Sequence, residues 1–122
     1  MNIDLSALIT LLQQPEAYDH SVDKIQLKET HVSLVIMTGQ YVYKIKKSVD
    51  YGFLDFSTLE KRKIYCEEEV RLNSRLAPNM YLGVVPICGD LNSAKINGKG
   101  AIIEYAVKMR QFDTQQEFDK LL

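Results

Sequence analysis

The feature that most constrains the fold is a change of side-chain period between residues 41 and 76. From Tyr41 to Lys46 the side chains alternate with a period of two, which predicts a β-strand carrying Val42 and Lys44 on one face. From Ser57 to Leu76 the apolar residues recur at helical spacing, which predicts the longest helix of the chain. Because a strand and a helix each bury one side, we expect this helix to pack on the sheet that contains the strand.

The remaining patterns predict further strands and a second helix. Residues Asp4–Gln14 form an amphipathic helical pattern, and a nearly apolar run over Val32–Thr38 predicts a strand covered on both faces. Gly39 is suited to the tight turn that joins this run to the next strand. Pro86 predicts an edge position or a bulge in its strand. The other expected strands are Lys24–Lys28, Tyr81–Cys88, and a hairpin in which Asn97–Gly100 joins Ala94–Ile96 to Ala101–Met109.

These elements predict an α+β fold in a single domain over residues 1–122. The expected architecture is a mostly antiparallel sheet of five to six strands, with one long packed helix and an N-terminal helix. A further helix begins at Asp113 or Thr114 and stops after barely two turns, with its apolar side hardly begun. We interpret this ending as a truncation and expect the natural chain to continue.

Composition excludes several classes of protein. The net charge of -1 argues against non-specific binding to nucleic acid, and no apolar run approaches the roughly 20 residues that span a membrane. The N-terminus lacks the features of a signal peptide. Cys66 and Cys88 stand alone, and His20 and His31 show no metal-ligand spacing. We therefore expect a cytoplasmic protein with reduced thiols, no metal site, and neither nucleic acid nor membrane as a partner.

Lys44 is an unusual residue for its position, because it is a cation in the middle of an apolar strand. One interpretation is that it protects an edge strand from pairing or extends its ammonium to solvent. The other is that it binds an anion. Lys46 and Lys47 lie at the end of the same strand, where we expect solvent to be near.

The helix contains three consecutive glutamates, and helical geometry selects one of them as buried. At 100° per residue, Glu67 and Glu68 fall outside the apolar arc of roughly 160°, whereas Glu69 falls near its centre. A buried carboxylate needs a cation, because an unpaired charge is costly to bury. The apolar arc is formed by Leu59, Tyr65, Cys66, Val70, Leu72 and Leu76.

Two cations are candidates for the partner of Glu69. Arg62 lies seven residues earlier on the same helical face, and such a pair would only brace the helix. Lys44 is the candidate from the sheet. Asn73 also lies beside Glu69 on the helix and is expected to serve as a structural polar residue.

The start of the helix and the preceding loop are also predicted. Ser57 with Glu60 three residues later has the spacing of a capping box. Asp55 is placed to accept hydrogen bonds from backbone amides near the helix start, which is a structural role. The loop from Val49 to Phe56 is rich in aromatic residues, so we expect it to pack back on the domain.

The chain resembles the N-terminal lobe of the protein-kinase-like fold, and more closely a bacterial group of aminoglycoside-phosphotransferase-like proteins. The order of elements matches: a three-stranded meander, a lysine within the third strand, a long helix with one buried glutamate, and further strands. The matching motifs are Glu29-Thr30-His31-Val32-Ser33, Val42-Tyr43-Lys44-Ile45-Lys46-Lys47, the run from Gly52 to Arg62, the run from Cys66 to Pro78, and Tyr81-Leu82-Gly83-Val84-Val85-Pro86.

The resemblance implies a nucleotide-binding role for particular residues. The third-strand lysine of such lobes binds the α- and β-phosphates of ATP and pairs with the helix glutamate, and these positions match Lys44 and Glu69. Val42 would touch the adenine ring. The adenine edge would meet a hinge backbone formed by Glu104, Tyr105, Ala106 and Val107.

The resemblance also implies what this chain cannot do alone. The turn Glu29–His31 has no glycine-rich phosphate loop, and the catalytic and metal-binding aspartates belong to a C-terminal lobe that is absent here. We therefore expect no catalytic residue in this chain, and no phosphoryl transfer by it alone. The full-length protein would use ATP with Mg2+ and an unknown small-molecule acceptor, whereas we expect no cofactor bound to this chain. Because half of the nucleotide pocket would belong to the missing lobe, we expect ATP binding by this chain to be weak or undetectable.

The sequence is also compatible with two other functions. The chain could be a non-catalytic regulatory or interaction module that keeps the kinase-like lobe, since members of the group occur fused to a P-loop domain. It could also be a free-standing interaction protein. In either form, the exposed face of the sheet could support a homodimer.

Overall fold

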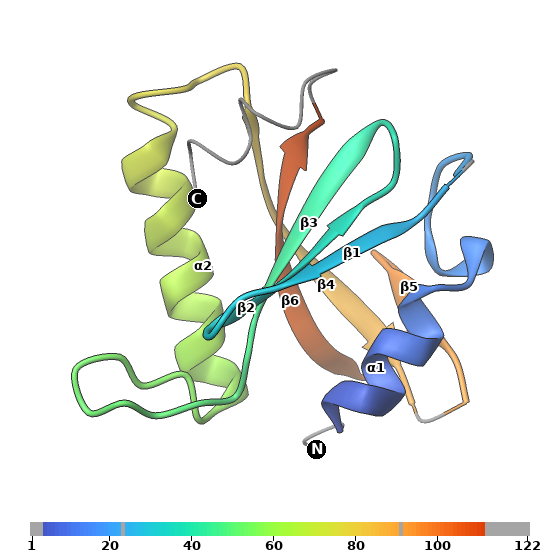
Figure 1. Ribbon diagram of the computed structural model, residues 1–122, viewed down its shortest axis with the longest axis horizontal. Coiled ribbons are helices and arrows are strands. Elements are labelled where there is room, and N and C mark those ends of the chain that lie inside the picture. Colours follow the sequence, from blue (N-terminus) through green and yellow to red (C-terminus); the bar gives the residue numbers. More distant parts are fainter. Residues whose placement is uncertain (1–3, 23, 91, 112–122) are drawn as a thin grey trace.

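A six-stranded antiparallel sheet forms the centre of the computed structural model, which describes residues 4–22, 24–90 and 92–111 (Figure 1). The strands lie side by side in the order β1-β2-β3-β6-β4-β5, and every neighbouring pair is antiparallel. The predicted α+β class is confirmed. In chain order the strands are β1 Gln26–Glu29, β2 Ser33–Met37, β3 Tyr41–Lys46, β4 Tyr81–Gly89, β5 Ala94–Ile96 and β6 Ile102–Arg110.

Two α-helices cover opposite faces of the sheet. Helix α1, Leu5–Leu12, is followed by a short 3-10 helix, η1 Pro15–Ala17, and helix α2 is Leu59–Asn73. Figure 1 shows α2 running along one side of the sheet and α1 near the β4–β5 end on the other. One core cluster joins α1 to the sheet through Leu8, Leu12, Leu34, Ile36, Tyr43 and Ile45, and the other joins α2 through Val35, Val42, Cys66, Val107 and Met109.

The first three strands form the predicted meander. Strand β2 is buried along its whole length, as its apolar sequence predicted, because both faces of the sheet are covered there. Gly39 takes a positive φ of 95° in the β2–β3 turn. Strand β3 lies between β2 and β6. It is therefore an internal strand, which excludes the interpretation of Lys44 as protection of a sheet edge.

The predicted hairpin between β5 and β6 is wrong. Strand β5 pairs with β4 instead, and β6 pairs with β4 and β3, so the chain crosses from one side of β4 to the other. Asn97 has a positive φ of 55°, so a turn forms where the sequence predicted one, but it does not join paired neighbours. Pro86 is tolerated because β5 reaches β4 only from Ile87 to Gly89, which leaves Pro86 with a strand on one side only.

The start of α2 differs from the predicted capping box by one residue. Thr58, not Ser57, is the N-cap, and its hydroxyl accepts a hydrogen bond from the Lys61 amide at 3.1 Å. The Ser57 amide donates to Asp55 Oδ1 at 3.0 Å, which keeps Ser57 in the turn before the helix. This bond confirms the structural role predicted for Asp55. An ion pair with Lys61 also holds Asp55.

Several predictions about burial at the ends of α2 are wrong. Helix α2 ends at Asn73, and Leu72 and Leu76 are 50% and 86% exposed. Val70 and Ala77 pack on the core at this end instead. In the preceding loop Phe56 is buried, but Phe53 is 83% exposed, so the loop packs back only at its end. Among the described residues, no helix has the length and apolar character to cross a membrane. The helix predicted from Asp113 onward lies outside the described residues.

Candidate functional site

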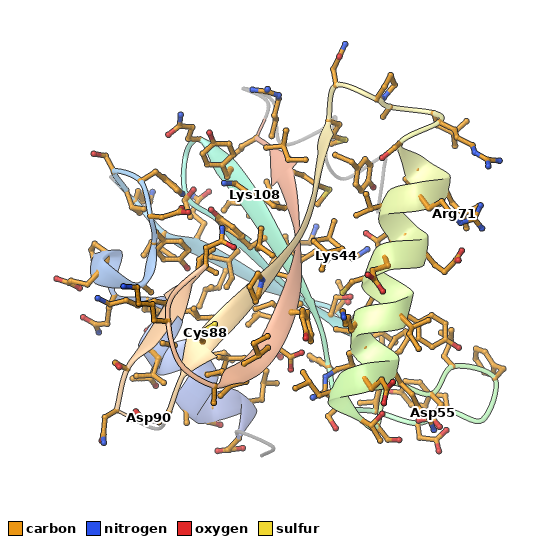
Figure 2. All side chains as sticks on the ribbon, turned by 180° about the vertical axis from the view of Figure 1, so that it is seen from behind. Lys44, Asp55, Arg71, Cys88, Asp90 and Lys108 are labelled. Atoms are coloured by element: carbon orange, nitrogen blue, oxygen red, sulfur yellow. The ribbon has the colours of Figure 1, made fainter. Side chains whose placement is uncertain are left out.

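Two lysines of β3 and one glutamate of α2 form a charged cluster between the sheet and the helix. Lys44 Nζ lies 3.4 Å from Glu69 Oε2, and Lys46 Nζ lies 2.5 Å from Glu69 Oε1. The three side chains are 17%, 9% and 11% exposed for Lys44, Lys46 and Glu69 respectively. Figure 2 shows Lys44 between the strands and α2. The cluster thus places three largely buried charges in contact.

Local periodicity explains how these residues meet. The alternation of β3 puts Lys44 and Lys46 on the face that α2 covers, with Val42 on the same side. On α2, Glu67 and Glu68 are exposed, whereas Glu69 is mostly buried. The selection of Glu69 by helical geometry is therefore confirmed, and so is Lys44 as a partner.

Lys46 is the residue whose place in the site was not predicted. We expected solvent at the end of β3, but Lys46 is buried and makes the shorter contact with Glu69. The reason is that the loop after β3 returns over it, so that the Phe56 ring lies 5.5 Å from Lys46 Nζ. The alternation already put Lys46 on the same face as Lys44, and that signal could have identified it.

Arg62, the rival partner of Glu69, forms a different pair. Its Nε lies 3.1 Å from both carboxylate oxygens of Glu104, and its guanidinium donates to the Phe56 carbonyl at 2.8 Å. Arg62 and Glu104 are 2% and 6% exposed, so this is a buried pair that fastens α2 to β6. The alternative in which Arg62 braces Glu69 is excluded, because the Arg62 side chain extends to β6 and not along its own helix.

The hinge predicted at Glu104, Tyr105, Ala106 and Val107 does not fit the structure. These residues lie within β6, where they are in register with β4, and Ala106 and Val107 also face Ile45 and Lys44 of β3. Ala106 and Val107 have strands on both sides, so their backbone donors and acceptors are used in the ladder and are not free for an adenine edge. Glu104 and Tyr105 pair with β4 alone, and the Tyr105 amide donates to Glu104 Oε1 at 3.0 Å. Glu104 is instead a structural residue that pairs with Arg62.

Two further residues of the predicted site, Val42 and Asn73, have structural roles. Val42 lies on the face of Lys44, as predicted, and it is fully buried in the cluster under α2. An adenine ring could reach Val42 only if part of that cover moved. Asn73 hydrogen-bonds the Tyr81 side chain, which ties the end of α2 to β4.

The electrostatics of the cluster are unbalanced. Lys44 and Lys46 carry two positive charges against the single negative charge of Glu69, and the nearby Arg62–Glu104 pair is neutral. Burial lowers the pKa of Lys44 below its ordinary value, Glu69 opposes this shift, and the like charge of Lys46 adds to it.

Cys66 lies in the same buried region, but its thiol is unreactive. Burial raises the pKa of Cys66 to about 12, so its thiol stays protonated and is a poor nucleophile. Within the part of the chain that the structure describes, no group of three or more His, Cys, Asp or Glu side chains could hold a metal ion. The chemistry that this site offers is that of two ammonium groups sharing one carboxylate.

Three mycobacterial proteins are similar to this chain. It is 34% identical over 98 residues to an uncharacterized protein of Mycobacterium bovis and to uncharacterized proteins of two strains of Mycobacterium tuberculosis. The match covers 80% of this chain but only 18% of each relative, so the chain spans less than a fifth of their length. No family model and no solved structure matches the chain.

Proposed function

We propose that this chain is the nucleotide-binding lobe of an ATP-dependent small-molecule phosphotransferase with a kinase-like fold, acting in the cytoplasm. The observation that carries the proposal is the contact of Lys44 with Glu69 between β3 and α2, at 3.4 Å. In kinase-like lobes a third-strand lysine holds the α- and β-phosphates while a helix glutamate orients it. The excess positive charge of the cluster favours a bound anion of this kind.

The arrangement of the sheet supports the same proposal. The three-stranded meander comes first, the lysine lies in its third strand, and α2 follows and covers one face. Strands β4 and β6 then complete the sheet beside β3, with the short β5 as an addition at the edge. This is the order of elements expected of a kinase-like N-terminal lobe, and the support is an analogy of fold.

In this proposal the chain provides only some of the groups that phosphoryl transfer requires. Lys44 would bind and neutralise phosphate oxygens, and Glu69 would orient the Lys44 ammonium. The Mg2+ that travels with ATP would neutralise phosphate charge, and its ligands, like the catalytic base, would come from a second lobe. The small-molecule acceptor would also bind there, so its identity does not follow from this chain.

Labelling with an acyl-phosphate analogue of ATP tests the proposal, because this reagent acylates a lysine that lies beside the bound phosphates. We expect mass spectrometry to find Lys44 acylated, and excess ATP to protect it. Lys95 and Lys99 are exposed lysines far from the cluster and serve as internal controls for non-specific acylation. Equal labelling of all three without protection by ATP would refute nucleotide binding at this site.

A second candidate function is a regulatory or interaction module that binds no nucleotide. The observation that favours it is the exposure of large apolar side chains on α2 and on the loops before and after it, namely Tyr51, Phe53, Ile64, Leu72 and Leu76. From the sheet, only Leu82 and Ile102 join them among the described residues, so the predicted homodimer through a sheet face stays a prediction. An absence of ATP-protected labelling would favour this second function.

A further inference from the structure

We propose that Lys46 is a positioning residue, which holds Glu69 in place and so leaves the Lys44 ammonium available to a phosphate group. This inference rests on the proposed function, since it concerns the same site. It differs from the expected pairing of one lysine with one glutamate, because here two lysines share the carboxylate. The role of Lys46 depends on which lysine holds Glu69 more firmly.

The two contacts with Glu69 are unequal. Lys46 Nζ lies 2.5 Å from Oε1, whereas Lys44 Nζ lies 3.4 Å from Oε2. Charge-assisted hydrogen bonds between ammonium and carboxylate are commonly about 2.7–2.9 Å long. The Lys46 contact is shorter than this range and the Lys44 contact is longer, so the Lys44 contact is the looser of the two. Lys46 is also the less exposed lysine. Glu69 is therefore held mainly by Lys46.

Lys46 is fixed in turn by its surroundings. The Phe56 ring lies 5.5 Å from its ammonium, and the Phe56 carbonyl accepts a hydrogen bond from Arg62. Arg62 and Glu69 are seven residues apart on α2, so they face the sheet from points about two turns apart. Two ion pairs thus fasten helix α2 to the sheet, namely Glu69 with Lys46 and Arg62 with Glu104.

The charge balance then determines the role of Lys44. With Glu69 neutralised by Lys46, the Lys44 ammonium remains a largely buried cation, and among the described residues its one hydrogen bond is the 3.4 Å contact with Glu69. An incoming phosphate would supply the missing negative charge. Without Lys46, the carboxylate would be free to pair fully with Lys44, and a phosphate would have to compete with it. Lys46 therefore favours phosphate binding although it need not touch the phosphate.

A test that requires no substitution uses the side-chain ammonium signals of the two lysines in 15N-labelled protein. We expect the Lys46 signal to persist, since its hydrogens are held by Glu69, while exchange with water broadens that of Lys44. Inorganic triphosphate is the probe, added at up to millimolar concentration. It should shift the Lys44 signal and leave Lys46 in place. A Lys46 signal that exchanges as fast as that of Lys44 would overturn the inference.

Variants provide the second test. The K46M substitution removes the competing cation, so we expect triphosphate affinity to fall at least about tenfold and the pKa of Lys44, followed through its labelled Cε, to rise. K46R keeps a cation beside Glu69 and should retain wild-type affinity, which a purely packing role of Lys46 would not predict. K44M is the control that removes the phosphate ligand itself.

The outcomes separate this inference from the proposed function. If wild-type protein binds triphosphate and K46M binds it equally well with an unchanged Lys44 pKa, the positioning role is refuted and the proposed function survives. If no form binds triphosphate, the proposed function fails. In that case the Lys44 pKa in K46M still decides whether Lys46 controls the charge state of its neighbour.

Discussion

The substitution E69Q tests the most consequential contact in the molecule, because it removes the one negative charge that two buried ammonium groups share. Lys44 and Lys46 lie 3.4 and 2.5 Å from the Glu69 oxygens, and all three side chains are less than a fifth exposed. Removing one partner of a buried ion pair costs about 3–5 kcal/mol. Since the glutamine carbonyl keeps one acceptor and some water reaches the cluster, we expect a loss of about 3 kcal/mol.

The loss should be evident in chemical and thermal unfolding. A small domain has about 5–15 kcal/mol of stability in total, so this change is a large part of it. For a domain of this size it corresponds to a fall in Tm of roughly 10–15 °C. Urea unfolding followed by circular dichroism would measure the free energy, and an unchanged m-value would show that both forms unfold to similar states.

The matched control is E67Q, which makes the same chemical change two positions earlier on α2. Glu67 is exposed, so its removal should alter stability little. The double variant E69Q/K46M should recover part of the loss of E69Q, because it leaves one buried ammonium unpaired in place of two. If E69Q and E67Q lose the same free energy, the buried cluster does not stabilise α2 in the way described.

Further predictions concern the rest of α2 and its neighbours. The N-cap variant T58A should lose about 1 kcal/mol of unfolding free energy while T58S keeps most of it, and equal losses would refute the cap. R62M should destabilise by about 3–5 kcal/mol since it leaves the Glu104 carboxylate buried without a cation, and adding E104Q should restore part of this in the same unfolding assay. Iodoacetamide should alkylate Cys66 slowly in native protein at pH 8, because burial raises the pKa of this thiol to about 12, and alkylation as fast as in urea would contradict this burial. Hydrogen bonds from Lys61 and Ser57 lower the pKa of Asp55 from 3.8 to about 2. The stability these bonds provide should be present above pH 3.8 and decline as the pH falls through about 2, and D55N should lack this dependence when helix unfolding is followed against pH.

The residues of the candidate site whose positions the sequence predicted correctly are those that local periodicity determines. The period of two in β3 puts Lys44 on the face toward α2, and the period of α2 selects Glu69 from three neighbouring glutamates. Each of these assignments needs only the geometry of one element, because the burial of one face forces the side chains of that face together.

The errors arose where distant parts of the chain decide the outcome. Arg62 was a plausible partner for Glu69 on the helix alone, but β6 brings Glu104 within reach of it. Lys46 was predicted to lie near solvent, but the loop after β3 returns and places Phe56 over it. The hinge predicted from Glu104 onward lies inside β6, because the length of that strand depends on its pairing with β3 and β4.

The sequence by itself therefore determined the class of fold, the strand that carries the lysines and the glutamate that meets them. Only the tertiary structure decided that β5 joins β4, that Arg62 pairs with Glu104, and that Lys46 shares Glu69 with Lys44. The physical reason is that side-chain period is a local property, whereas strand order and the choice among several cations depend on contacts between residues far apart in the chain. The unequal sharing of Glu69 by two lysines is a result of such contacts.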